Sequence, residues 1–166
     1  MIRKALLPLL AIAALSCAAR ADDSPASSVE RRLSEATKSP GTTVVHFWAP
    51  WCPNCRSELA NGAWSGFIAS NPGTHFVFVT IWSPDGGREL LEKNGVGAQG
   101  NFELLVHPNG SRKADRVTQL LGIPISWIPT TWIFRDGKLC YAMNYGELRF
   151  PMLEQLIKDS ADSWDH

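Results

Sequence analysis

Apolar and polar positions follow two rhythms along this chain. Short continuous apolar runs, rich in Val, Phe and Trp, predict buried strands, and longer stretches with apolar residues every three or four positions predict helices. The predicted strands are residues 43–48, 75–82, 102–106, 130–134 and 138–144. The predicted helices are residues 29–37, 53–70, 88–93, 113–121 and 151–159.

The order of these elements predicts the fold class. Strands and helices alternate up to the fourth strand, and Asp136-Gly137 then joins two strand-like runs, which is a strong hairpin pattern. Alternation followed by a terminal hairpin favours an α/β fold with a central mixed sheet and helices on both faces. The length of 166 residues fits one folded domain.

The first residues have the pattern of an export signal. Arg3 and Lys4 precede an apolar stretch at 5–15, and Ala19-Arg20-Ala21 is an A-x-A-type cleavage site. That stretch is too short to span a bilayer as a helix, which needs roughly 20 residues. We therefore predict a signal peptide at 1–21 cleaved near Ala21, a linker and short helix at 22–40, and a domain at 41–166 in the periplasm or another extracytoplasmic space.

Cys17 leaves a second export route open. The run 15–17, Leu-Ser-Cys, resembles a bacterial lipoprotein signal, in which the cysteine is acylated and becomes the first residue. The A-x-A site favours soluble export, so membrane attachment is expected only if Cys17 is lipidated.

Charge excludes one class of partner. Lys and Arg together number 16, as do Asp and Glu, so there is no basic excess for binding nucleic acid. A monomer is the default expectation.

Cysteine spacing points to redox chemistry. Cleavage would leave Cys52, Cys55 and Cys140, and the first two form a C-x-x-C pair. Cys140 is left over, and we expect it to be a buried small hydrophobic residue of a strand.

The position of the C-x-x-C pair explains how it would react. Cys52 falls where a strand becomes a helix, so its sulfur would face free N–H groups and the positive end of the helix dipole, which favour the thiolate. Pro53 would occupy the first helical turn. Cys52 would be the exposed nucleophile and Cys55 the resolving thiol behind it. A static disulfide, or a zinc or copper site that also uses His46, remains as an alternative.

Three motifs resemble those of one family. They are FWAPWCPNCRSE at 47–58, VHPNG at 106–110 and IPTTWIFRDGK at 128–138. The first and third resemble the active-site run and the P-T-T segment of the thioredoxin superfamily. More narrowly, all three are similar to exported TlpA/ResA-like thiol-disulfide oxidoreductases. The resemblance covers about residues 40–160 and implies a thioredoxin fold.

The resemblance also implies site residues. Pro129 matches the cis-proline that lies against the C-x-x-C pair, and it would present the Ile128 backbone to a substrate. Glu58 matches the acid of the R-x-E pattern, and since it follows Cys55 by three residues it shares that helix face and could relay its proton. His46 departs from the family, which has Asp or Asn there; it would accept the Cys55 proton or be a hydrogen-bonded core residue.

A substrate surface is expected around these groups, formed by Trp51, Pro53, Asn54, Trp127 and Ile128. Trp82 is expected in a strand and in the core.

The predicted function is reduction of disulfides in exported proteins through the Cys52–Cys55 couple, without another cofactor. The resemblance implies a membrane electron donor as partner. An exported oxidase or isomerase, or a non-enzymatic copper or zinc carrier, remains as an alternative.

Overall fold

The computed structural model describes residues 24–82, 85–110, 112–144, 146 and 148–162. The predicted signal peptide, with Cys17, lies outside the described residues. The helices are α1 Pro25–Lys38, α2 Pro53–Leu59, α3 Ala63–Ser70, α4 Gly87–Lys93 and α5 Phe150–Asp159, with short 3-10 turns η1 Ala60–Gly62 and η2 Lys113–Asp115. The strands are β1 Thr42–Trp48, β2 Thr74–Thr80, β3 Phe102–Val106, β4 Gln119–Leu120, β5 Ile123–Pro124, β6 Thr130–Arg135 and β7 Lys138–Met143.

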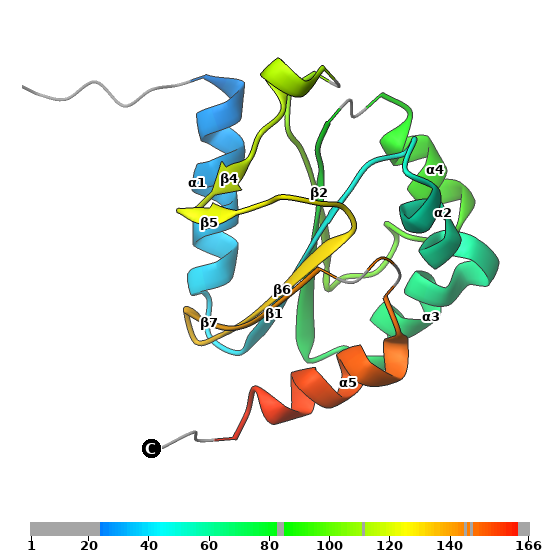
Figure 1. The fold of residues 1–166 in the computed structure, drawn as a ribbon. Coiled ribbons are helices and arrows are strands. Elements are labelled where there is room, and N and C mark those ends of the chain that lie inside the picture. Colours follow the sequence, from blue (N-terminus) through cyan, green and yellow to red (C-terminus); the bar gives the residue numbers. More distant parts are fainter. Residues whose placement is uncertain (1–23, 83–84, 111, 145, 147, 163–166) are drawn as a thin grey trace, which may run out of the picture.

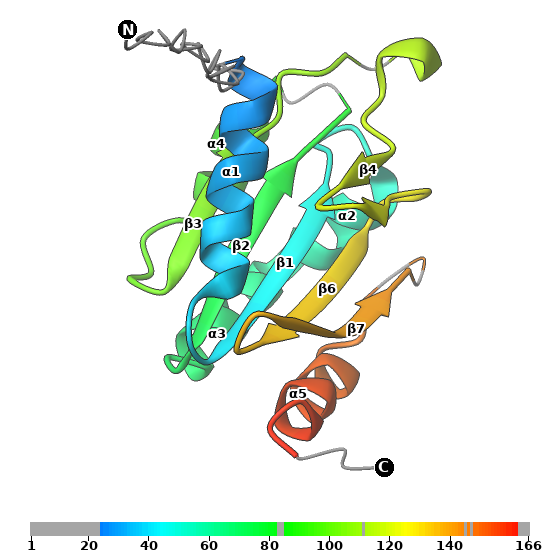
Figure 2. The ribbon, with the colours of Figure 1, turned by 90° about the vertical axis from the view of Figure 1, so that its left-hand side faces the viewer.

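Five of the strands form the central sheet, in the order β3-β2-β1-β6-β7 (Figure 2). β1, β2 and β3 run parallel, while β6 runs antiparallel to β1 and β7 antiparallel to β6. The mixed sheet predicted from the order of the elements is therefore confirmed.

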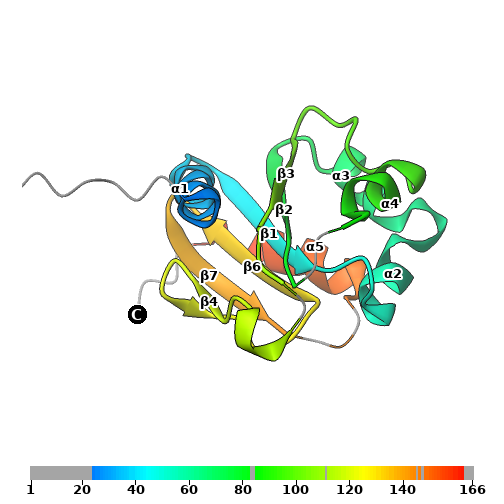
Figure 3. The ribbon, with the colours of Figure 1, turned by 90° about the horizontal axis from the view of Figure 1, so that it is seen from above.

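Helices cover both faces of this sheet, as predicted (Figures 1 and 3). α1 lies on one face and packs with β4 and β5 over the side chains of one apolar cluster. α2, α3, α4 and α5 lie on the other face over a second cluster, which contains the two cysteines of the C-x-x-C pair. Strand β1 contributes to both clusters, because its successive side chains point to opposite faces.

Helix α1 is longer than predicted and belongs to the domain core. Ser24 caps it, since its side chain accepts a hydrogen bond from the Ser27 amide at 3.2 Å, and Pro25 fills the first turn. Val29, Leu33 and Ala36 recur at helical spacing and pack on the sheet. None of the described helices has a long enough apolar stretch to cross a bilayer.

The single helix predicted at 53–70 is wrong, because the chain turns in the middle of it. Asn61 has φ of 58° and Gly62 has φ of 68°, and these left-handed conformations separate α2 from α3. Asn-Gly is the pair of residue types that adopts such angles at least cost. The break lets α3 turn Trp64 and Ile68 into the core independently of α2.

The helix predicted at 113–121 is also wrong. Only the short turn η2 forms there, and β4 then pairs with β5 in a small antiparallel ladder. Leu121 at φ 51° and Gly122 at φ 74° form a two-residue hairpin turn. The Leu121 amide is held by the Glu30 carboxylate of α1 at 2.7 Å, a contact distant in sequence that outweighs local helix propensity.

Cys140 lies exposed on β7, so the prediction that it is buried is wrong. Tyr141 and Met143 alternate with it along the strand and pack on the cluster beneath α5. Cys140 therefore points to the opposite face, where the edge strand β7 carries exposed side chains.

The packing of α1 gives a stability prediction. Leu33 is 0% exposed, so Leu33→Ala should lower the free energy of unfolding by about 2–5 kcal/mol through lost burial and a cavity. The exposed Lys38→Ala on the same helix should change it by less than about 0.5 kcal/mol. Urea unfolding followed by circular dichroism measures both, and equal effects would show that α1 is not packed as described.

Candidate active site

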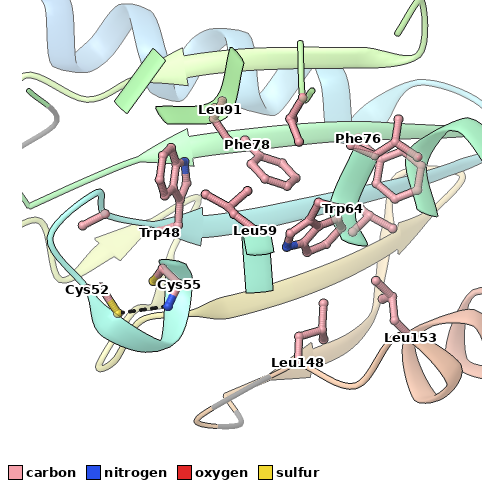
Figure 4. Close-up of a cluster of buried hydrophobic side chains, with 14 of the residues drawn as sticks. Trp48, Cys52, Cys55, Leu59, Trp64, Phe76, Phe78, Leu91, Leu148 and Leu153 are labelled. Atoms are coloured by element: carbon pink, nitrogen blue, oxygen red, sulfur yellow. Dashed lines mark hydrogen bonds between the residues drawn. The ribbon is translucent and has the colours of Figure 1, made fainter. Parts of the chain in front are cut away.

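Cys52 begins helix α2 as its N-cap. Its backbone is extended, with φ −74° and ψ 121°, and its sulfur accepts a hydrogen bond from the Cys55 amide at 3.5 Å (Figure 4). Pro53 follows at the first helical position, where an N–H would have no helical partner. The sulfur therefore faces the free amides at the positive end of the helix, as predicted.

The two cysteines are free thiols that lie close together, and both are buried. Cys52 is 5% exposed and Cys55 is 1% exposed, so Cys52 is the more accessible one but is not the exposed nucleophile that the sequence predicted. The residue before Pro129 covers the Cys52 sulfur. The S–H of Cys52 donates a hydrogen bond to the Ile128 carbonyl oxygen, which lies 3.7 Å from the sulfur.

The peptide bond between Ile128 and Pro129 is cis, which confirms the expectation drawn from the motif at 128–138. Pro129 directly precedes β6, the neighbour of β1 in the sheet. The turn at Ile128–Pro129 thus lies beside the end of β1, from which the chain enters the C-x-x-C pair.

Burial controls the protonation of Cys55. Loss of solvent raises the pKa of its thiol well above the usual range, and the hydrogen bond and charge of Cys52 and the charge of Glu58 add to this effect. The thiol of Cys55 therefore keeps its proton near neutral pH unless a nearby base takes it.

A buried polar cluster lies beside Cys55 on the α2 face of the sheet. Glu58 follows Cys55 by one helical turn, and one of its carboxylate oxygens accepts a hydrogen bond from the Leu148 amide. Its other oxygen lies 3.3 Å from Nε2 of His46 on β1. Thr131, directly opposite His46 on β6, places its hydroxyl 2.9 Å from Nδ1.

His46 is neutral in this cluster. A carboxylate at 3.3 Å favours the imidazolium, but complete burial among Trp64 and Phe78 opposes any charge. Burial wins and lowers the pKa of His46 to about 3. Of the two roles that the sequence left open for His46, the structure therefore favours that of a hydrogen-bonded core residue. Its imidazole also contacts the carboxylate of Glu58, which the family resemblance implies as a proton relay.

The predicted substrate residues lie around this site. Trp51, which directly precedes Cys52 in the sequence, is 45% exposed. Trp127, which directly precedes Ile128, is 69% exposed. Pro53 and Asn54 are exposed at the start of α2, and Ile128 is half-buried.

Sequence reasoning missed three contributors to the site. Thr131 belongs to the P-T-T motif, but the motif does not indicate that its hydroxyl contacts His46. Trp82 is buried, as expected, but it lies beyond the end of β2, and its carbonyl accepts a hydrogen bond from the Trp51 indole at 2.5 Å. Arg116 stacks on both indoles, and no local motif marks it.

In the described part of the chain, no group of three or more His, Cys, Asp or Glu side chains is arranged to hold a metal ion. His46 faces Glu58 and Thr131.

Comparison with solved structures identifies the fold. MTB DsbF in mixed oxidized and reduced forms is 23% identical, with TM-score 0.55 over 73% of this chain and 81% of that chain. A secreted Mycobacterium tuberculosis disulfide oxidoreductase homologous to E. coli DsbE is 24% identical, with TM-score 0.53 over 72% and 81%. A thiol:disulfide interchange protein of the thioredoxin family from Chlorobium tepidum TLS is 17% identical, with TM-score 0.55 over 76% and 83%.

These likenesses define the class of structure to which the chain belongs. Neither protein-family models nor curated proteins give a match to the sequence. At these identities the structural neighbours establish the fold alone, and that fold is the thioredoxin fold, as the motifs implied.

The buried imidazole predicts an acid sensitivity. Since the pKa of His46 is near 3 in the folded protein and about 6.5 when unfolded, the unfolded state binds more protons below pH 6.5. Stability is therefore complete above that pH and falls as pH drops towards 3, with a loss of about 2–3 kcal/mol between pH 7.5 and 4.5 from this group.

Urea unfolding at both pH values measures this loss. His46→Gln should be markedly less acid-sensitive than the unsubstituted protein, whereas His75→Gln, at a half-exposed strand position, should keep most of the sensitivity. Equal acid sensitivity of His46→Gln and the unsubstituted protein would mean that His46 is not buried as a neutral base.

Proposed function

We propose that this protein is an exported thiol-disulfide oxidoreductase that reduces disulfides in other exported proteins. The observation that carries the proposal is the pairing of a helix-capping Cys52 sulfur with the buried thiol of Cys55, against the turn at Ile128–Pro129. Disulfide exchange begins with attack by a thiolate, and the capping position gives the Cys52 sulfur a backbone N–H, that of Cys55, as a hydrogen-bond donor.

The first step is attack by Cys52. Its thiolate attacks one sulfur of the substrate disulfide, so a Cys52–substrate S–S bond forms, the substrate S–S bond breaks, and one substrate sulfur leaves as a thiolate. The exposed indoles of Trp51 and Trp127, together with Pro53, Asn54 and Ile128, supply the surface against which the substrate segment lies.

The second step is resolution by Cys55. After loss of its proton, Cys55 attacks the Cys52 sulfur, which forms the Cys52–Cys55 disulfide and releases the second substrate thiol. The substrate gains two electrons and the protein dithiol loses two. No further cofactor takes part, and a dithiol electron donor, proposed to be membrane-bound, must reduce the pair again.

Glu58 is the proposed acceptor of the Cys55 proton. It lies one turn beyond Cys55 in a site without solvent access, and its carboxylate acts on the Cys55 pKa. His46 positions that carboxylate through its Nε2, and Thr131 fixes the imidazole from the other side. This arrangement gives a buried thiol an internal base.

The leader-like sequence at 1–21 supports a periplasmic location. One structural neighbour is described as secreted. The rival functions are an exported oxidase or isomerase, and a copper or zinc carrier.

Turnover of insulin disulfides tests the proposal directly. Cys52→Ser and Cys55→Ser should each reduce the rate to that of dithiothreitol alone, because each removes one of the two exchange steps. Cys140→Ser, on the edge strand β7, should keep the full rate. Unchanged turnover in either of the first two variants would rule out dithiol exchange at this site.

The equilibrium potential of the couple separates the rivals. We expect a value near that of thioredoxin, about −270 mV, whereas a value near −120 mV would indicate an oxidase. Tightly held stoichiometric metal in the purified reduced protein would instead support a carrier.

The role of Glu58 predicts a change in pH dependence. Glu58→Gln should slow release of the second substrate thiol about 100-fold at pH 7, because Cys55 has lost its internal base. As the pKa of Cys55 is raised, its thiolate fraction grows with pH, so the defect should shrink as pH increases.

Single-turnover quenched-flow measurements between pH 6 and 10 follow this release. Ser57→Ala, at the neighbouring exposed position of α2, serves as the control and should match the unsubstituted profile. A defect of constant size at every pH would show that Glu58 has only a structural role.

A further inference from the structure

The VHPNG turn at 106–110 takes no part in the exchange steps proposed for the two cysteines, yet one of its side chains joins three other residues. The Asn109 side-chain oxygen accepts a hydrogen bond from the Trp82 amide at 3.2 Å and lies 3.1 Å from Nδ1 of His107. Its side-chain nitrogen donates to the Asp115 carbonyl at 3.1 Å. Asn109 therefore connects the end of β3 with the residue that follows β2 and with the turn η2.

Two backbone groups fix the orientation of the Asn109 amide. The Trp82 N–H needs an acceptor and the Asp115 carbonyl needs a donor, so the amide oxygen faces Trp82 and the amide nitrogen faces Asp115. Since that oxygen can only accept, Nδ1 of His107 carries the hydrogen of the third contact. All three contacts thus depend on the side chain of Asn109.

Trp82 has a backbone conformation that needs such support. Its φ of 54° lies in the left-handed region, which is unfavourable for a bulky side chain. Its amide is held by Asn109, and its buried indole donates to the Val117 carbonyl at 2.7 Å. These two contacts hold Trp82 on both sides and so fix the direction of its own carbonyl.

The Trp82 carbonyl in turn holds Trp51, the residue before the reactive cysteine. It accepts a hydrogen bond from the Trp51 indole at 2.5 Å. The Trp51 backbone lies in a tight turn, in which the Cys52 amide donates to the Ala49 carbonyl at 3.1 Å. The Trp51 ring is 45% exposed and yet fixed at both ends. A ring that is ordered in advance binds a partner with little further loss of side-chain entropy.

We propose that Asn109 is a positioning residue for substrate binding, which acts through the Trp82 backbone to hold the Trp51 ring beside Cys52. The proposal rests on the proposed function, since it needs a substrate that forms a mixed disulfide at Cys52. A small disulfide reacts at the sulfur and does not extend over the ring, so the contribution of Asn109 is specific to peptide and protein substrates.

Steady-state reduction of a disulfide-bonded peptide and of 2-hydroxyethyl disulfide tests this role. Asn109→Ala should raise KM for the peptide about fivefold, with the effect in KM rather than in kcat, because the Trp51 ring is no longer ordered before binding. The ratio of kcat/KM for the peptide to that for the small disulfide should fall by the same factor. Asn109→Asp, which keeps an acceptor for the Trp82 amide, should have a smaller effect.

A second asparagine serves as the matched control. The Asn101 side chain donates to the carbonyls of Ile68, Asn71 and Thr74, close to the start of β2, whereas Trp82 lies beyond the end of that strand. Asn101→Ala should lower the free energy of unfolding but keep both the KM for the peptide and the ratio between the two substrates. A general loss of stability is thereby distinguished from a loss of positioning.

A double-mutant cycle shows whether Asn109 acts through Trp51. Trp51→Phe keeps an aromatic ring but removes the N–H that the Trp82 carbonyl accepts. If the two residues act as one unit, Asn109→Ala combined with Trp51→Phe should raise KM no further than the larger single effect. If Asn109→Ala fails to fold, Asn109→Asp takes its place in the cycle and is judged in the same way.

The outcomes are separable. Single effects that multiply in the double variant, or a peptide KM that stays unchanged when Asn109 is replaced, would overturn the positioning role while leaving thiol–disulfide exchange intact. Failure of the unsubstituted protein to reduce either substrate would overturn the proposed function itself. A raised peptide KM that does not increase further in the double variant, and is absent in Asn101→Ala, would support the role of Asn109.

Discussion

A thiol enclosed in the protein interior must lose its proton without help from water, and this constraint governs the arrangement of the whole site. Cys55 is a buried residue of the first turn of α2, and burial raises the pKa of its thiol. A base must therefore be supplied from within the core. Glu58, one helical turn beyond Cys55, is the base proposed for this step. Its burial in turn requires partners, which the Leu148 amide and the His46 imidazole provide.

The fold brings these partners together from separate elements. β1 carries His46 and leads into Cys52, and β6 follows Pro129 and places Thr131 opposite His46. The chain entering α5 closes over Glu58 through Leu148. Glu58, Pro129, Thr131, Met143 and Leu148 line one narrow crevice. The cis-proline turn that faces Cys52 is thus also part of the wall around the carboxylate.

Much of this could be predicted from the sequence, because the relevant patterns are local. The apolar runs predicted the strands, and Cys52-Pro53 predicted the capped start of α2. The failures arose where distant contacts or single backbone angles decide the structure. The left-handed residues Asn61 and Gly62 divide a stretch whose apolar periodicity predicts one continuous helix. The hydrogen bond from the Leu121 amide to the Glu30 carboxylate favours a hairpin where a helix was predicted. The His46–Glu58 contact and the contact of Arg116 with the Trp82 ring join residues that are distant in the sequence, so no spacing rule could have found them.

The division of labour between the two cysteines is the central claim, and trapping the covalent intermediate tests it most directly. A Cys55→Ser, Cys140→Ser protein should accumulate one stable mixed disulfide with a disulfide peptide, and mass spectrometry should locate it on Cys52. The matching Cys52→Ser, Cys140→Ser protein should form little or none over the same time, because its remaining thiol is buried and protonated. Equal adduct formation by the two proteins would contradict the account.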